Sequence, residues 1–593
     1  MTLTPELPLA CAALALALVA ILRVLPWREH PAMLAATIGI GALGSVAPLV
    51  AFPFVPVADV AGRALWEWSA AGGPTIQASY RLDGIGAIGA GLVTSYAVAS
   101  LIAATRGERS PVLAPLILAS GLTTIALAVS DDLIAATVLL GVLAAFTSAA
   151  AFLVAPPPAA ARVAAYFAVG LQGFILAALL VSRSGGASFR FGDLRATAIS
   201  PGIVLAASLG AALFAGLYPF VPWRYQRAKS RSAERETLRG LVTMPAGIGA
   251  TLVLLRLLGV TRTDLTTLGL PGIEAAPRVL LVLVTVAIVL GLTVRRRAVP
   301  TSAIVIGALV VAATVTYPGL HWSHVVLASA ILTIAYAAAV SLAHPAEWDV
   351  VRYDVALATL WIGLALGSPL SLAAALVVLG GDAAIAVAEA VWSPPHRAYL
   401  MLVSGAAVTV AGLGFMAIGA FEAGDAASIA LALVAVGGVL ALQLAHLARR
   451  AQIAIAPIGL EVTAAATSFL VAILLGILVA PAAFSGMAIT IGRPFSSEVT
   501  GAPLAAPLLV AVAVLIVAAV SSFQPVLRKA ERLVAGLHVA VRLADPVPAG
   551  MAAFSALDWT ATRLATALSL LERRAGVGLA TILIVLLLVW SVR

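Results

Sequence analysis

Apolar stretches of about 20 residues recur along almost the whole 593-residue chain. A helix that crosses a bilayer needs roughly 20 mainly apolar residues. Charged residues make up 10% of the chain and hydrophobic residues 62%, whereas charged residues are about a quarter of an ordinary soluble protein. The pattern predicts an all-α, polytopic integral membrane protein, with no segment polar and long enough for a separate soluble domain.

The apolar stretches predict about 16 to 18 transmembrane helices. Residues 353–392 are either two helices divided at Pro369 or one broken helix, and the parity of the arginine-containing loops favours two. The expected spans are 5–25, 33–56, 84–104, 111–129, 132–154, 161–182, 201–220, 238–259, 278–294, 301–318, 324–343, 353–367, 369–392, 399–421, 427–447, 462–482, 503–522 and 576–592.

Arginines are concentrated in short loops between these spans, mainly after the odd-numbered ones. Positive residues mark cytoplasmic loops of membrane proteins. We therefore expect a multi-pass protein of the bacterial cytoplasmic (inner) membrane with its N-terminus outside. The net charge of +9 follows from these loops, so no nucleic acid is expected as a partner. The loop arginines include Arg28, Arg106, Arg109, Arg162, the run from Arg224 to Arg239, and Arg295 to Arg297.

Cysteine usage and the N-terminal sequence narrow the protein class further. The single cysteine, Cys11, excludes a disulfide framework and a cysteine-bound cluster. Glu6 precedes the first apolar run and no basic residue does, so this run is expected to be a first transmembrane helix rather than a cleaved signal peptide. We find no pattern for a nicotinamide, flavin, quinone or metal site, and expect no cofactor.

Residues 524–545 differ from the rest of the chain. Apolar residues recur there at helical spacing among Arg528, Lys529, Glu531 and Arg532. This pattern predicts an amphipathic helix on the cytoplasmic membrane surface, before the last span. A surface loop with helical content is the alternative.

Four segments, in this order, carry a family resemblance. They are YRLDGIGAIGAGLVTSYAVASLI with Asp83, LILASGLTTIALAVSDDLIAATVLL with Asp132, YPFVPWRYQRA with Pro219 and Trp223 followed by LVTMPAGIGATLVLLRLLG with Arg256, and TVRRRAVPTSAIVIGAL. Together they resemble the antiporter-like membrane subunits of respiratory complex I (subunit 5, or chain L type), Mrp antiporters and membrane-bound hydrogenases.

The resemblance implies a fold, partners and a layout. It implies a subunit that contributes to moving protons or sodium across the lipid bilayer, coupled to quinone/NADH or other redox chemistry in partner membrane subunits. Any enzymatic activity would then belong to an NADH:quinone oxidoreductase-like complex, with no catalytic residue in this chain. The implied divisions are N-terminal helices (1–110), a first antiporter-like half (111–300), a second half (301–482), and a C-terminal span, lateral helix and final span (483–593).

The chain departs from the family where the family moves ions. Aligned on the motifs, the intramembrane glutamate is replaced by Gly141, the broken-helix lysine by Ile248 and the signature histidine by Val221. The chain has only two lysines, Lys229 and Lys529, both outside the spans. A proton relay needs titratable groups, so we expect a divergent member whose first half has lost or weakened conduction.

The second half retains ionisable residues. Asp382 and Glu389 are two turns apart, and so lie on one face of the expected helix 369–392. With Glu422 and His446 they are the candidate ion-pathway residues. The alternative is that Glu389, Glu422, His446 and Glu461 lie at helix ends in water or headgroups, which leaves Asp382 alone in the membrane.

Two functions of other classes stay open. A stand-alone secondary transporter of a small solute would use paired broken helices, for which 245–249 and 412–420 are candidates. A non-conducting membrane scaffold would use the same fold without transport. Arg256, at the end of an apolar run, is expected to extend toward the surface or to cap a helix end.

Overall fold

A computed structural model describes the following residues: 6–26, 28, 30–51, 63–69, 75–107, 112–183, 188–196, 200–221, 233–258, 322–343, 348–367, 369–390, the short runs 412–414, 416–417 and 435–439, and single positions between 409 and 562. The chain divides into two compact units, residues 1–544 and 545–593, and every element below belongs to the first. The expected surface helix, the expected spans between 278 and 318, and those after residue 399 lie outside the described stretches.

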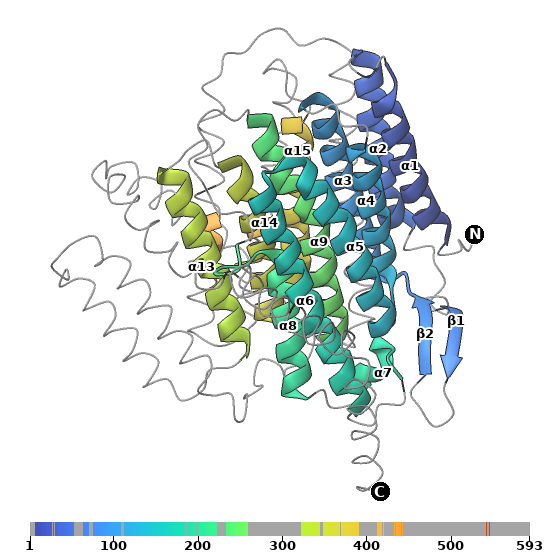
Figure 1. Cartoon of the computed structure of the whole chain (residues 1–593), viewed down its shortest axis with the longest axis vertical. Helices are drawn as coiled ribbons and strands as arrows, with labels where there is room; N and C mark the ends of the chain where they lie inside the picture. The colour runs from blue at the N-terminus through green and yellow to red at the C-terminus, as the bar shows by residue number, and fades with distance from the viewer. Residues whose placement is uncertain are drawn as a thin grey trace, which may run out of the picture. The chain divides into compact units, whose positions relative to one another are not determined.

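Helices dominate the described residues (Figure 1). Seven of them are long and apolar enough to cross a membrane, and α4, α8 and α13 are shorter apolar helices. This confirms the expected all-α polytopic membrane fold. The helices are α1 (Glu6–Val24), α2 (Pro31–Ala51), α3 (Gly84–Gly107), α4 (Leu113–Val129), α5 (Leu133–Val154), α6 (Pro157–Arg183), α7 (Phe191–Ala196), α8 (Pro201–Ala215), α9 (Ala233–Leu258), α13 (Trp322–Ala343), α14 (Trp348–Leu366) and α15 (Pro369–Ala390).

Residues 348–390 form two separate helices rather than one broken helix. Gly367 follows α14 with φ of 63°, a left-handed conformation that costs glycine little, and Pro369 begins α15 at a position where its missing N–H is not needed. The two helices are antiparallel, because Gly363 near the end of α14 lies against Ser371 near the start of α15.

Burial separates inner helices from outer ones. In the apolar stretches of α3 and α9, 94% of the residues are buried, against 39% in α5 and 33% in α6. The centrally placed α9 packs against α3, α4, α5, α8 and α14. The outward faces of α5 and α6 carry exposed apolar side chains such as Val138, Leu176 and Leu179. Such faces suit contact with lipid or with another membrane subunit.

Helix α9 is continuous through the proposed break at 245–249. Pro245 has no N–H for the carbonyl of Leu241 one turn earlier. The Ser100 hydroxyl of α3 donates to the Tyr96 carbonyl over 2.8 Å and lies 3.5 Å from that Leu241 oxygen, so a polar group of a neighbouring helix faces it. An interrupted helix at this position, as a stand-alone transporter would use, is therefore wrong. Pro245 is accommodated by packing.

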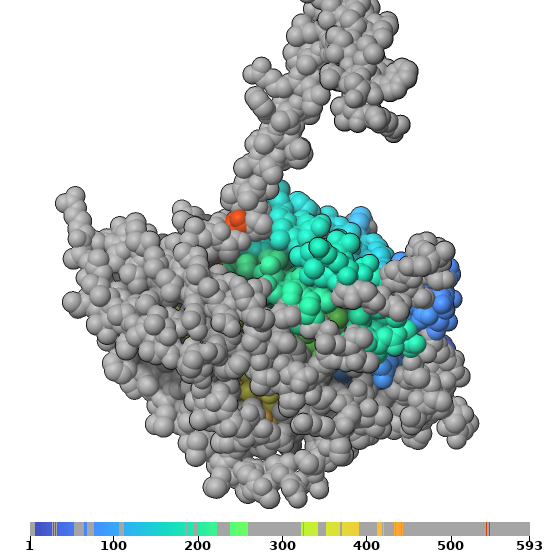
Figure 2. All heavy atoms as spheres, turned by 90° about the horizontal axis from the view of Figure 1, so that it is seen from below, coloured from blue at the N-terminus to red at the C-terminus, as the bar shows by residue number. Residues whose placement is uncertain are grey.

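A β-hairpin lies at one end of the helices and was not predicted (Figure 1). Strands β1 (Arg63–Ser69) and β2 (Thr75–Tyr80) pair antiparallel with Glu67 opposite Gln77. Figure 2 shows the molecule from this end. The atoms of the hairpin are blue there and lie at the edge of the teal and green atoms. The two strands have only seven and six residues. Their sequence lacks a long alternating apolar pattern, so between apolar spans it looks like the sequence of a loop.

Candidate functional site

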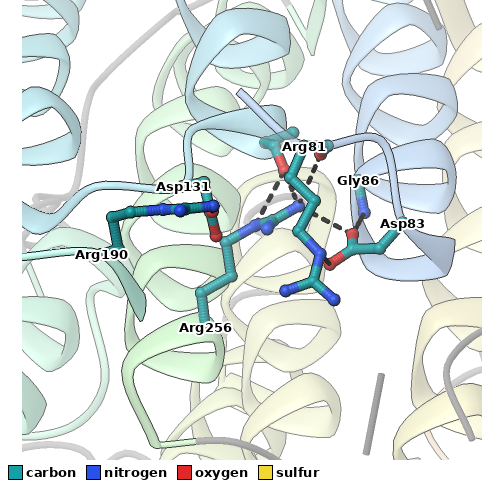
Figure 3. Close-up of polar contacts among 7 residues, drawn as sticks. Arg81, Asp83, Gly86, Asp131, Arg190 and Arg256 are labelled. Carbon is teal, nitrogen blue, oxygen red and sulfur yellow. Dashed lines mark hydrogen bonds and ion pairs between the residues drawn. The ribbon is translucent and has the colours of Figure 1, made fainter. Parts of the chain in front are cut away.

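Asp83 and Arg256 form a buried ion pair at the hairpin end of α3 and α9 (Figure 3). The Arg256 Nη2 atom lies 2.7 Å from Asp83 Oδ1, and both side chains are 1% exposed. Arg256 also donates from Nε and Nη2 to the Ala128 carbonyl in the last turn of α4, over 3.1 and 2.8 Å. Arg256 therefore caps the end of another helix. The expectation that it extends toward the surface is wrong.

Two adjacent acids, Asp131 and Asp132, organise the turn between α4 and α5. Asp132 caps α5 by accepting from the backbone N–H groups of Ile134 and Ala135, over 2.8 and 2.9 Å. Burial raises the pKa of the Asp132 carboxyl, while hydrogen bonds from these N–H groups and from that of Gln77 oppose the rise. Asp131 pairs with Arg190 over 3.3 Å (Figure 3).

The motif residues thus have structural positions at helix ends. Asp83, Asp132 and Arg256 join α3, α4, α5 and α9 at the hairpin end of the bundle. Pro219 follows a cis peptide bond with Tyr218, shortly after α8. Trp223 lies outside the described stretches.

The first half has neutral side chains where the family motif places charged ones. Ile248 is fully buried among apolar side chains, and so is Val221. A side chain at Gly141 would meet Leu171 of α6 at 3.4 Å. The described helices α4, α5 and α8 contain no Asp, Glu, Lys, Arg or His.

Hydroxyl groups supply the polar contacts in this part of the bundle. Ser120 of α4 and Thr147 of α5 share a hydrogen bond of 3.3 Å. Thr251 of α9 accepts from the indole N–H of Trp361 in α14 over 3.1 Å. Ser and Thr hydroxyls join membrane helices in this way, but they do not titrate in the range in which a proton carrier works.

The second half places three charged side chains together inside the helices. Arg352 of α14 lies between two acids of α15: its Nε is 3.1 Å from Asp382 Oδ1, and its Nη1 is 2.7 Å from Glu389 Oε2. The side chains of Arg352 and Asp382 are 0% and 1% exposed, and that of Glu389 is 4% exposed. We call these three residues, with Tyr96 and Tyr353, the acid cluster.

Two tyrosines complete the acid cluster. The Tyr96 hydroxyl of α3 donates to Asp382 Oδ2 over 2.8 Å. The Arg352 guanidinium carbon lies 4.6 Å from the centroid of the Tyr353 ring, and the rings of Tyr353 and Tyr96 meet edge to face at 6.5 Å. The acid cluster therefore joins α3, α14 and α15 by contacts that fix both sides of Asp382.

The structure brings together two of the four predicted pathway residues. Asp382 and Glu389 share Arg352, and the Glu389 side chain is 4% exposed although it lies in the last turn of α15. Glu422 and His446 lie outside the described stretches.

Sequence reasoning missed Arg352 and Tyr96. The antiparallel turn at 367–369 could have identified Arg352, because equal distances from the turn place its level between those of Asp382 and Glu389. Nothing in the sequence connects Tyr96 with an acid 286 positions away.

Comparison with known proteins identifies the architecture. The fold is similar to a chain of an Mrp complex from Dietzia sp. DQ12-45-1b, with a TM-score of 0.60 and 15% identity over 93% of this chain and 60% of that one. The chain has the fold of antiporter-like membrane subunits. No protein-family model matches it, and no curated protein matches its sequence.

Two further solved structures share this fold. A chain of respiratory complex I from Thermus thermophilus with bound NADH aligns with a TM-score of 0.52 and 15% identity, covering 86% of this chain and 99% of that one. A chain of the membrane-bound sulfane sulfur reductase, an archaeal respiratory membrane complex, aligns with a TM-score of 0.54 and 12% identity, covering 87% and 85%. The chain thus spans almost all of the complex I chain, but about three fifths of the Mrp chain.

Proposed function

We propose that this protein is an antiporter-like membrane subunit of a multisubunit complex, and that its second half moves ions by way of Asp382 and Glu389. The observation that carries the proposal is the acid cluster, in which two carboxylates and a guanidinium are buried among apolar helices. Ionisable groups in a membrane interior are costly and mark ion pathways or proton relays. The fold supports the same assignment.

The contrast between the halves supports an asymmetric subunit. The first half has Ile248 and Gly141 at the aligned charge positions and hydroxyl groups between its helices. The acid cluster offers carboxylates from two residues whose backbones are about 10 Å apart along α15, and both contact the Arg352 guanidinium. We propose Glu422 and His446 as further stations beyond this pair.

The assembly is proposed by analogy with proteins of the same fold. Redox chemistry with a quinone, NADH or another donor would occur in partner subunits and drive the ion movement. We propose a location in the bacterial cytoplasmic membrane with the N-terminus outside, on the basis of the loop arginines.

A non-conducting scaffold is the second candidate, and one observation favours it. Arg352 holds both acids at 2.7 to 3.1 Å, an arrangement that would also brace α14 against α15. The two candidates differ in what removal of one carboxylate does: a brace loses stability, whereas a pathway loses transport in a complex that remains assembled.

Proton movement into everted membrane vesicles that contain the native complex tests the proposal. We expect Asp382→Asn to reduce transport at least tenfold while the partner subunits still co-purify with the chain. The matched control is Asp193→Asn, an exposed acid on α7, which should transport like the wild type. Unchanged transport of protons and sodium in assembled Asp382→Asn complexes would favour the scaffold.

A further inference from the structure

We infer that Arg352 acts as a built-in cation of the acid cluster and makes this site selective for protons over sodium ions. The inference depends on the function proposed above, because it concerns which ion the same two carboxylates carry. It is supported by four features: the groups that face the carboxylate oxygens, the intact helix backbones around them, the charge of the guanidinium and its fixed position.

Arg352 and Tyr96 face the carboxylate oxygens that a metal ion would need. Asp382 Oδ1 faces Arg352 Nε at 3.1 Å, and Asp382 Oδ2 accepts from the Tyr96 hydroxyl over 2.8 Å. Glu389 Oε2 faces Arg352 Nη1 at 2.7 Å. A sodium ion that used these oxygens would have to displace the guanidinium and the hydroxyl.

The backbone around the acid cluster offers few replacement ligands. Sodium sites in membrane proteins use carbonyl oxygens of unwound helix segments. Helices α3, α14 and α15 are continuous through Tyr96, Arg352, Asp382 and Glu389. Their carbonyl groups at these levels accept hydrogen bonds within the helices. The Leu379 oxygen also accepts from the Tyr96 hydroxyl over 3.2 Å.

The charge of Arg352 opposes a second cation. A guanidinium stays protonated in proteins. At about 4 Å and an effective dielectric constant of about 20, repulsion between two unit charges lowers the affinity for the second one roughly a thousandfold. The guanidinium opposes protonation of the carboxylates as well, but a proton needs only one carboxylate oxygen, whereas a sodium ion needs several oxygen ligands at once. The proton later leaves from the same oxygen, while Arg352 keeps its own protons and faces the remaining carboxylate.

The surrounding helices hold the guanidinium in place. Among the described side chains, the charged and titratable groups on the helices packed against this part of α15 are Tyr96 on α3, Arg239 on α9 and, on α14, Arg352, Tyr353 and Asp354. The Tyr353 ring contacts the guanidinium and itself lies against Gly240 of α9. Arg352 therefore cannot move away from the acids without repacking three helices.

Ion replacement in everted vesicles tests the inference. With the wild-type complex, we expect proton transport to change less than twofold when choline replaces sodium, and no uptake of radioactive sodium that depends on Asp382. Arg352→Lys, which keeps the charge, should retain this independence of sodium, although with transport reduced several-fold. Wild-type transport that requires sodium, or sodium uptake that Asp382→Asn abolishes, would overturn the inference and leave the proposed function standing.

A binding measurement on the purified full chain provides a second test. Sodium chloride, compared with choline chloride, should not raise the thermal unfolding temperature of the wild type or of Arg352→Lys. In Arg352→Gln the built-in charge is absent, so sodium should raise it; no sodium effect in a folded Arg352→Gln protein would contradict the inference. Loss of the proposed function is recognised separately, by Asp382→Asn complexes that transport both ions normally.

Discussion

Gly240→Ala should destabilise the protein by displacing the Tyr353 ring. A methyl group at Gly240 would overlap that ring, whose Cε2 atom would lie 2.7 Å away. Overpacking of this kind costs about 1–3 kcal/mol, and displacing the ring from Arg352 removes a cation–π contact worth about 0.5–2 kcal/mol. The helix preference of alanine over glycine offsets about 1 kcal/mol. We expect a net loss of about 1–3 kcal/mol.

Gly380→Ala is the matched control, because Gly380 is also a helical glycine and lies two residues from Asp382. A methyl group there would meet Leu92 at 3.8 Å, an ordinary contact. This variant should gain up to about 1 kcal/mol from helix preference. The two alanine variants should therefore differ in stability by about 1–4 kcal/mol, and this difference can be measured without the absolute stability of the wild type.

Thermal unfolding of the full chain in mild detergent, followed by the fluorescence of its ten tryptophans, measures this difference. Gly240→Ala should unfold at a lower temperature than the wild type, and Gly380→Ala at the same temperature or a higher one. Adding Tyr353→Leu to Gly240→Ala should restore part of the loss, since the smaller side chain relieves the overlap. A Gly240→Ala protein as stable as Gly380→Ala would show that the ring does not occupy this position, and would refute the described packing of Arg352.

Two further predictions concern the hairpin end of the bundle. Arg256→Met should lower the free energy of unfolding by about 3–5 kcal/mol, because it leaves Asp83 charged and buried. Adding Asp83→Asn should recover part of this loss in the same unfolding assay. Strictly additive losses from the two substitutions would contradict the pairing. Asp132→Ala should lose a helix cap worth about 1 kcal/mol, whereas Asp132→Asn keeps a capping oxygen. Because the pKa of Asp132 is raised above its ordinary 3.8, the folded state binds this proton more tightly, and stability falls as pH rises from 3.8 through the folded pKa. Asp132→Asn should lack that fall, and a wild-type-like pH profile in this variant would contradict the burial effect.

The sequence predicted the helices far better than the contacts between them. Apolar length alone places α1 to α6, α8 and α9 within a few residues, because a membrane helix must satisfy its own backbone and needs a fixed apolar length. The hairpin β1–β2 carries no comparable requirement, and it was missed. Pro245 was a candidate for a helix break, because the sequence does not show how closely α9 packs against the neighbouring helices.

The candidate site was half predictable for a related reason. The seven-residue spacing of Asp382 and Glu389 places them on one helix face from sequence alone. Arg352 was assigned to a loop, although α14 begins four residues earlier, at Trp348. Tyr96 depends on how α3 packs against α15, which is a property of the tertiary fold.

Position within the fold distinguishes the buried charges of this chain from one another. Arg256 and Asp83 are as buried as Arg352 and Asp382, so burial alone does not identify a pathway. Arg256 lies in the last turn of α9, with a helix-end carbonyl as its second partner; these groups neutralise each other and complete a cap. Asp382 lies eight residues before the end of α15, far from any backbone group that lacks a partner, so capping does not explain its presence there. A carboxylate kept in such a position, beside a second carboxylate that contacts the same guanidinium, is the arrangement in which one acid can gain a proton while Arg352 continues to neutralise the other.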